Sequence, residues 1–105
     1  MAIPKTYAKF KRKHPELVAA YEALGEACRA AGPLDAKTAA LVKLGIALGA
    51  GLEGATHSAA RKAVEAGCTA NELLHAAVLA TPTLGFPAMM RGRAWVMDVV
   101  EPSRP

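Results

Sequence analysis

The sequence is poor in aromatic residues and in cysteine. Only 5% of its 105 residues are aromatic, and its two cysteines, Cys28 and Cys68, stand forty positions apart. This separation matches neither the close cysteine pairs of zinc sites nor those of dithiol redox centres. We therefore expect both thiols to remain reduced and to pack as small hydrophobic side chains.

Long apolar runs are also lacking. Charged or polar residues interrupt every apolar stretch before it is long enough to span a bilayer. The first residues do not contain the apolar centre that a signal peptide needs. These absences predict a soluble, cytoplasmic protein with no membrane partner.

The alternation of polar and apolar residues that is typical of strands is absent, whereas apolar residues recur at helical spacing. Asp35 is suited to cap one helix, and Thr69 with Glu72 forms the pattern of a capping box for another. The sequence therefore predicts an all-α, compact domain of about five helices, over residues 15–31, 35–50, 52–66, 69–79 and 87–100.

Apolar residues are abundant although few are aromatic: 52% of the chain is hydrophobic, mostly Ala, Leu and Val. The helix expected over residues 35–50 is apolar on nearly all sides, which is typical of a central, buried helix. So much apolar surface on so short a chain favours association with further copies. We expect a homo-oligomer.

Positive charge is concentrated at the N-terminus. The net charge is +4, and five of the 13 basic residues fall in the first thirteen positions: Lys5, Lys9, Lys11, Arg12 and Lys13. We interpret residues 1–13 as a basic N-terminal arm and residues 14–105 as a single helical domain. Nucleic-acid binding by this arm is an alternative, but no zinc-finger spacing, recognition helix or stacking platform accompanies it.

Glu53 and His57 are the strongest candidates for chemistry. A carboxylate and an imidazole four residues apart lie on the same side of a helix. The carboxylate can then orient the imidazole and raise its basicity, which makes a general acid or base. The alternative is a solvated pair on an exposed face. Arg91 and Arg93 could neutralise a carboxylate ligand, although a solvated face is the simpler interpretation.

No metal ligand or other cofactor is expected. His75 could complete a metal site only if the fold brought it to Glu53 and His57, and the sequence contains no paired-histidine motif.

Between Leu34 and about Val100, short segments follow one another in a characteristic order: Leu34-Asp35-Ala36-Lys37-Thr38, Leu48-Gly49-Ala50-Gly51, Glu65-Ala66-Gly67, Thr69-Ala70-Asn71-Glu72-Leu73-Leu74 and Gly85-Phe86-Pro87. Together they resemble the carboxymuconolactone decarboxylase family, whose redox branch is alkylhydroperoxidase D-like. The resemblance implies a helical protomer that assembles into trimers or hexamers.

The redox branch of that family uses a glutamate, a Cys-x-x-Cys pair and a histidine. Alignment on the segments above places the glutamate at Ala40, the cysteines at Leu52 and Ala55, and the histidine at Ala59. All four positions are apolar in this sequence. The disulfide-cycling peroxidase chemistry of the redox branch therefore cannot be carried over to them.

The resemblance leaves three functions open. The first is non-thiol acid–base chemistry on a small anionic molecule, or binding of it, by Glu53 and His57. The second is the peroxidase-type antioxidant activity of the family, which the missing cysteine pair opposes. The third is a non-catalytic oligomeric scaffold, in which Leu52, Ala55 and Ala59 fill the former site. Whether the chain is an enzyme stays open at this point.

Overall fold

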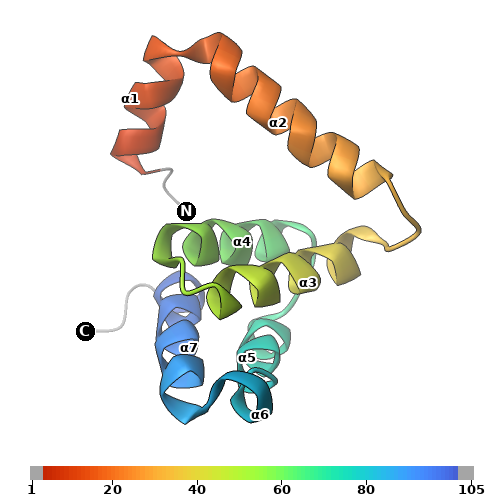
Figure 1. Cartoon of the computed structure of the whole chain (residues 1–105), viewed down its shortest axis with the longest axis vertical. Helices are drawn as coiled ribbons and strands as arrows, with labels where there is room; N and C mark the ends of the chain where they lie inside the picture. Colours follow the sequence, from red (N-terminus) through yellow and green to blue (C-terminus); the bar gives the residue numbers. More distant parts are fainter. Residues whose placement is uncertain (1–3, 102–105) are drawn as a thin grey trace. The chain divides into compact units, whose positions relative to one another are not determined.

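The computed structural model describes residues 4–101, and all regular structure in that range is helical (Figure 1). The elements are α1 (Lys5–Lys13), α2 (Pro15–Ala30), α3 (Ala36–Gly49), α4 (Glu53–Glu65), α5 (Ala70–Val78), α6 (Thr81–Leu84) and α7 (Phe86–Val100). This confirms the all-α prediction. Because α6 is a single turn of four residues, the described chain has six longer helices rather than about five.

Two compact units make up the described chain. Residues 4–34 contain α1 and α2, and residues 35–101 contain α3 to α7. No helix within residues 4–101 combines the length and the apolar character that crossing a membrane requires.

Helix α1 occupies residues for which the sequence predicted no regular structure. Its last turn carries Lys11, Arg12 and Lys13, whose charges are favourable beside the carbonyl end of a helix. The Tyr7 hydroxyl donates a hydrogen bond to Glu22 of α2 at 3.1 Å, and Lys11 Nζ lies 3.7 Å from the same carboxylate. The basic residues are good helix formers, and Tyr7 and Ala8 are half-buried, so α1 also has an apolar side. A domain boundary after residue 13 stays a prediction.

The predicted helix caps are confirmed. The Asp35 carboxylate accepts a hydrogen bond from the Thr38 backbone N–H at 2.8 Å, and this bond lowers the pKa of Asp35. Thr69 Oγ1 accepts from the Glu72 N–H at 3.1 Å, while the Glu72 carboxylate accepts from the Thr69 N–H at 2.8 Å. This second bond lowers the pKa of Glu72. These caps fix where α3 and α5 begin.

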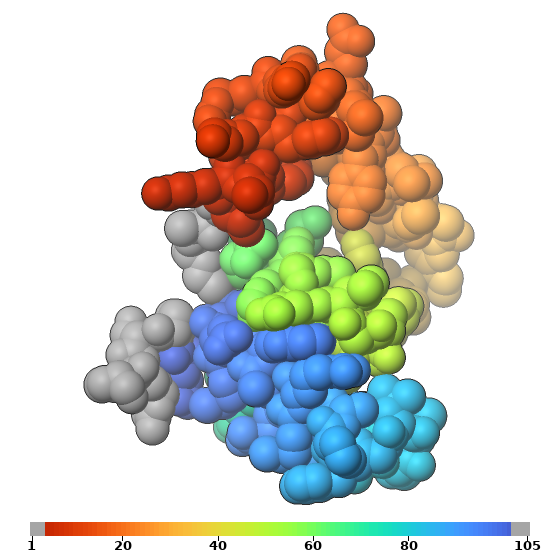
Figure 2. Space-filling view, turned by 60° about the vertical axis from the view of Figure 1, so that its left-hand side comes forward, coloured from red at the N-terminus to blue at the C-terminus, as the bar shows by residue number. Residues whose placement is uncertain are grey.

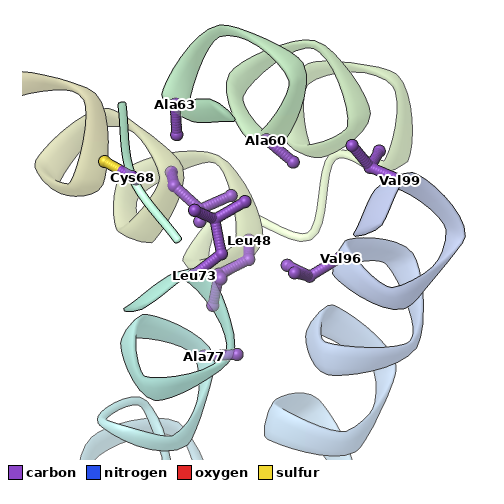
Figure 3. Packing of buried hydrophobic residues seen from close by; sticks show 9 residues of the cluster. Leu48, Ala60, Ala63, Cys68, Leu73, Ala77, Val96 and Val99 are labelled. Atoms are coloured by element: carbon purple, nitrogen blue, oxygen red, sulfur yellow. The ribbon is translucent and has the colours of Figure 1, made fainter. Parts of the chain in front are cut away.

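The five helices of residues 35–101 form two layers (Figure 1). Helices α3 and α4 run antiparallel as one layer, and α5 and α7 run antiparallel as the other, with α6 in the turn that joins them. The buried side chains between the layers are small or aliphatic (Figure 3); they are Leu44, Leu48, Ala60, Ala63, Cys68, Leu73, Ala77, Val96 and Val99. Alanine and valine side chains are small enough to let the helices approach closely.

Helix α3 is buried on one side only, so the expectation that it is central and covered all round is wrong for the single chain. Leu44 and Leu48 are buried in the core, and the space-filling view shows α3 in direct contact with α7 (Figure 2). On its other side Val42 and Ile46 are 47% and 66% exposed. The residue pattern shows which sides of a helix are apolar. In α3 the rest of the chain buries only one of these sides.

The close approach of α7 to α3 depends on Gly92. This buried glycine faces Leu48, and a Cβ added to it would lie 3.1 Å from Leu48 Cβ and 3.3 Å from Leu48 Cδ1. Leu48 Cβ is attached to the α3 backbone and cannot swing away. A side chain at residue 92 would therefore push the two layers apart.

We expect Gly92→Ala to be less stable than Gly45→Ala by about 1–3 kcal/mol in free energy of unfolding, because only the former overpacks the core. A Cβ on Gly45, in the middle of α3, would meet nothing within 4 Å. Gly45→Ala should raise stability by up to about 1 kcal/mol through helix propensity. Urea unfolding at one fixed protein concentration measures both. Equal stabilities of the two variants would contradict the close packing at Gly92.

The two cysteines lie in different environments. Cys68 is buried in the core next to Ala63, and its thiol lies 3.7 Å from the Lys37 carbonyl oxygen, to which it donates. Burial raises the pKa of this thiol, so the reactive thiolate is disfavoured at neutral pH. Cys28 of α2 is exposed. Core packing is thus the role the structure gives Cys68.

A thiol reagent should distinguish the two residues. We expect Ellman's reagent to modify one thiol per folded chain rapidly and the second only after unfolding, because burial limits access to Cys68. Cys28→Ser should remove the rapid reaction. Rapid modification of two thiols in the folded wild-type protein would show that Cys68 is more accessible than its burial indicates.

Candidate functional site

The first turn of α4 carries the predicted pair. After α3 the chain turns at Gly51, whose φ of +73° is strained for other residues, and Leu52 N–H bonds back to the Ala47 carbonyl at 3.2 Å. Buried Thr56 then donates its hydroxyl to the Leu52 carbonyl at 2.8 Å. These bonds fix the start of α4 at Glu53 and therefore the direction in which its side chains leave the helix.

His57 meets a residue of α7. Its Nε2 lies 3.0 Å from Asp98 Oδ2, and the two side chains are 26% and 60% exposed. An ionised carboxylate can only accept a hydrogen bond, so the proton in this contact belongs to Nε2. In the neutral imidazole Nδ1 is then the free basic atom. The Asp98 carboxylate thus holds the imidazole through Nε2, and Nδ1 is left to accept a proton.

Glu53 completes a cluster of three groups. One ligand atom each from Glu53, His57 and Asp98 lies within 4.8 Å of the other two. Within residues 4–101 no hydrogen bond joins Glu53 to His57; the partner of the imidazole is Asp98. The structure therefore brings the predicted pair together but assigns the orienting contact to a residue that the sequence analysis missed.

Asp98 stands 41 positions after His57, and only the packing of α7 on α4 makes them neighbours. The sequence does contain a weak signal. Asp98 is the single acidic residue in the apolar segment Trp95-Val96-Met97-Asp98-Val99-Val100, between two buried valines. A lone carboxylate beside core residues indicates a position on the edge of a helix interface.

Arg91 lies on the same side of α7, seven residues before Asp98. Its guanidinium carbon is 5.3 Å from the centre of the Trp95 ring, which is a cation–π contact. A Cβ on Gly51 would lie only 2.9 Å from Arg91 Nη2, so the glycine is what lets the guanidinium reach the α3–α4 turn. Across the described chain no carboxylate forms an ion pair with Arg91, nor with Arg93.

His75 is not part of this cluster. It borders a groove of about 650 Å³ between α3, α5 and α6, with a mostly apolar lining that includes Leu41, Val42, Leu79 and Leu84. Among the described residues, the group able to share a metal ion is Glu53, His57 and Asp98. The arrangement in which His75 would complete a site with Glu53 and His57 is therefore not formed.

The four positions aligned with the thiol site are split between core and surface. Ala40 and Ala59 pack against the core cluster. Leu52, by contrast, is 56% exposed, and Ala55 is exposed as well. The described chain thus places Ala59 against the core and Leu52 and Ala55 at the surface, and the scaffold hypothesis stays a prediction.

The family model for the carboxymuconolactone decarboxylase family matches residues 15–98. No curated protein and no solved structure matches the chain. The match covers most of the chain and includes α2 to α6 and nearly all of α7. The matched residues include Glu53, His57, Arg91 and Asp98. The chain belongs to the carboxymuconolactone decarboxylase family.

Proposed function

We propose that this protein binds a small carboxylated molecule beside α4 and catalyses a proton transfer to or from it, with His57 as the acid–base group. The observation that carries this proposal is the 3.0 Å contact between His57 Nε2 and Asp98 Oδ2, with Glu53 next to both. An oriented, half-buried imidazole that keeps one free nitrogen is the arrangement that general acid–base catalysis uses. A solvated Glu–His pair would have no third partner from another helix.

Recognition of an anion needs a positive group, because Glu53 and Asp98 would repel it. Arg91 is suited to this role: its planar guanidinium can accept a carboxylate in a two-point contact. Trp95 and Gly51 hold it beside the turn that leads into Glu53, and no protein carboxylate of the described residues occupies it. We place the carboxylate of the ligand at Arg91 and its reacting carbon towards His57.

Two related reactions fit this arrangement. In the first, His57 removes a proton from a carbon next to a carbonyl group and returns it at another position. In the second, a carboxylate leaves as CO₂, and the electron pair left on carbon takes a proton from the imidazolium. In both, Asp98 stabilises the positive charge of the protonated imidazole. Neither reaction needs a thiol, in agreement with the apolar residues at the aligned cysteine positions.

We expect His57→Gln to lower turnover by about 10²–10⁴-fold, the usual contribution of a positioned acid–base group. Asp98→Asn should lower it less, because the imidazole remains but loses its charged partner. The assay is a panel of small lactones with one or two carboxylates, read by CO₂ release and by uptake of solvent deuterium.

Two matched variants make this experiment decisive. Arg91→Gln should raise the KM while leaving kcat within a few-fold, because it acts on binding. Glu65→Gln, an exposed carboxylate at the far end of α4, should change neither constant. Full activity of His57→Gln, or no reaction of the wild-type protein with any member of the panel, would reject the proposal.

We also propose that the protein is a homo-oligomer whose contact includes the outer face of α3. Val42 and Ile46 lie one turn apart on this face and are largely exposed, although α3 has no acidic residue and only two basic ones. Uncharged apolar faces of this kind are normally covered. A second copy of the chain is a fitting partner, because two such faces meet without repulsion between like charges.

Ile46→Glu should shift the protein to a smaller species, because a carboxylate buried in the contact between copies would lack a partner. Light scattering on a size-exclusion column measures the molar mass. Lys43→Gln, an exposed polar position on the same helix, is the control and should keep the wild-type mass. A wild-type protein that is monomeric, or an unchanged mass for Ile46→Glu, would exclude α3 as the interface.

A further inference from the structure

The Glu53, His57 and Asp98 cluster has an excess of negative charge. It contains two carboxylates and one imidazole, and no lysine or arginine of residues 4–101 forms an ion pair with either carboxylate. Protonation of His57 would offset one of the two charges. A divalent cation would neutralise the two carboxylates, which no lysine or arginine of the described residues does.

The geometry of the cluster also suits a metal ion. Two ligand atoms bound at about 2.1 Å and at right angles are about 3.0 Å apart, and at the tetrahedral angle about 3.4 Å. The His57 Nε2 to Asp98 Oδ2 distance is 3.0 Å, and all three ligand atoms lie within 4.8 Å of one another. Any remaining gap can be closed by rotation of Glu53, because its side chain is exposed. The three groups can thus converge on one ion without movement of the helices.

We propose that Glu53, His57 and Asp98 bind one divalent transition-metal ion per chain. One imidazole nitrogen and two carboxylate oxygens form a ligand set suited to Zn²⁺, Mn²⁺, Fe²⁺ or Co²⁺. The ion takes the place of the proton on His57 Nε2, and that proton moves through solvent to Nδ1, so the imidazole stays neutral when the metal binds. Because only three protein ligands converge, the remaining coordination positions are open to water or to a ligand.

The metal would change what the site attracts. Without it, an anion approaching Arg91 also meets the charges of Glu53 and Asp98. With it, those charges are neutralised, and an open coordination position can take a carboxylate oxygen of the same molecule. This consequence rests on the proposed function, whereas metal binding itself rests only on the geometry and charge of the three side chains. The metal-bound form would also withdraw His57 from proton transfer.

The experiment is calorimetric titration of the metal-free, untagged full chain with Zn²⁺, repeated with Co²⁺ to record its visible ligand-field absorption. We expect one site per chain. His57→Gln and Asp98→Asn should each weaken binding by at least about tenfold, since each removes a ligand. Glu65→Gln lies on the same helix outside the cluster and should bind as the wild-type protein does.

The exposed Cys28 and His75 are competing ligands, so Cys28→Ser and His75→Gln are titrated as well. Both should retain the site. Loss of binding in either variant, unchanged binding in His57→Gln, or no binding by the wild-type chain would overturn the proposal. Circular dichroism of each variant confirms that it folds. Binding of a carboxylated lactone in the presence of EDTA tests the proposed function separately, so that failure of one inference is distinguishable from failure of the other.

Discussion

The packing of α4 against α7 is the constraint on which the rest of the structure depends. Ala60 and Ala63 of α4 belong to the same buried core as Val96 and Val99 of α7, and small side chains on α4 let the two helices approach closely. The same approach brings His57, one turn before Ala60, within 3.0 Å of Asp98, two residues after Val96. The site is therefore a direct product of the core. Any change that moves these helices apart breaks the contact between the imidazole and the carboxylate, even if both side chains are unchanged.

Most of the fold could be predicted from the sequence, because the signals that set it are local. Asp35 and the Thr69–Glu72 capping box mark helix starts within a few residues, and both are present as predicted. Helix α1 was missed because its apolar side is short, with only Tyr7, Ala8 and Phe10 among many charged residues. The exposed side of α3 was missed for another reason. The pattern of Val42 and Ile46 shows that this face is apolar, but not which molecule covers it.

The candidate site could be predicted only in part, because half of it depends on tertiary packing. The spacing of Glu53 and His57 follows from helix geometry and is visible in the sequence. Their relation to Asp98 is not, since it depends on the rotation of α7 about its own axis. Arg91 could be named as an anion-binding candidate, but its position beside Gly51 depends on the absence of a side chain on that glycine and on contact with the ring of Trp95. Local spacing thus identifies candidate groups, and packing decides their partners.

Under the proposed function, the position of the cluster on α4 explains how a family fold can lose one chemistry and keep the means for another. Leu52, Ala55 and Ala59, aligned with the thiol and histidine positions of the redox branch, follow a spacing of three and four residues along one side of the helix. Glu53 and His57 follow the neighbouring line, one residue further on, which corresponds to a rotation of about 100° around the axis. That rotation turns the polar groups towards α7 and Asp98. A change of chemistry then requires only that polar residues move from one line of a single helix to the next, while the core residues that hold α4 in place stay apolar. The fold can persist under such a change because the core contacts of α4 come from later turns, where Ala60 follows His57 and Ala63 follows Ala59 and both stay apolar.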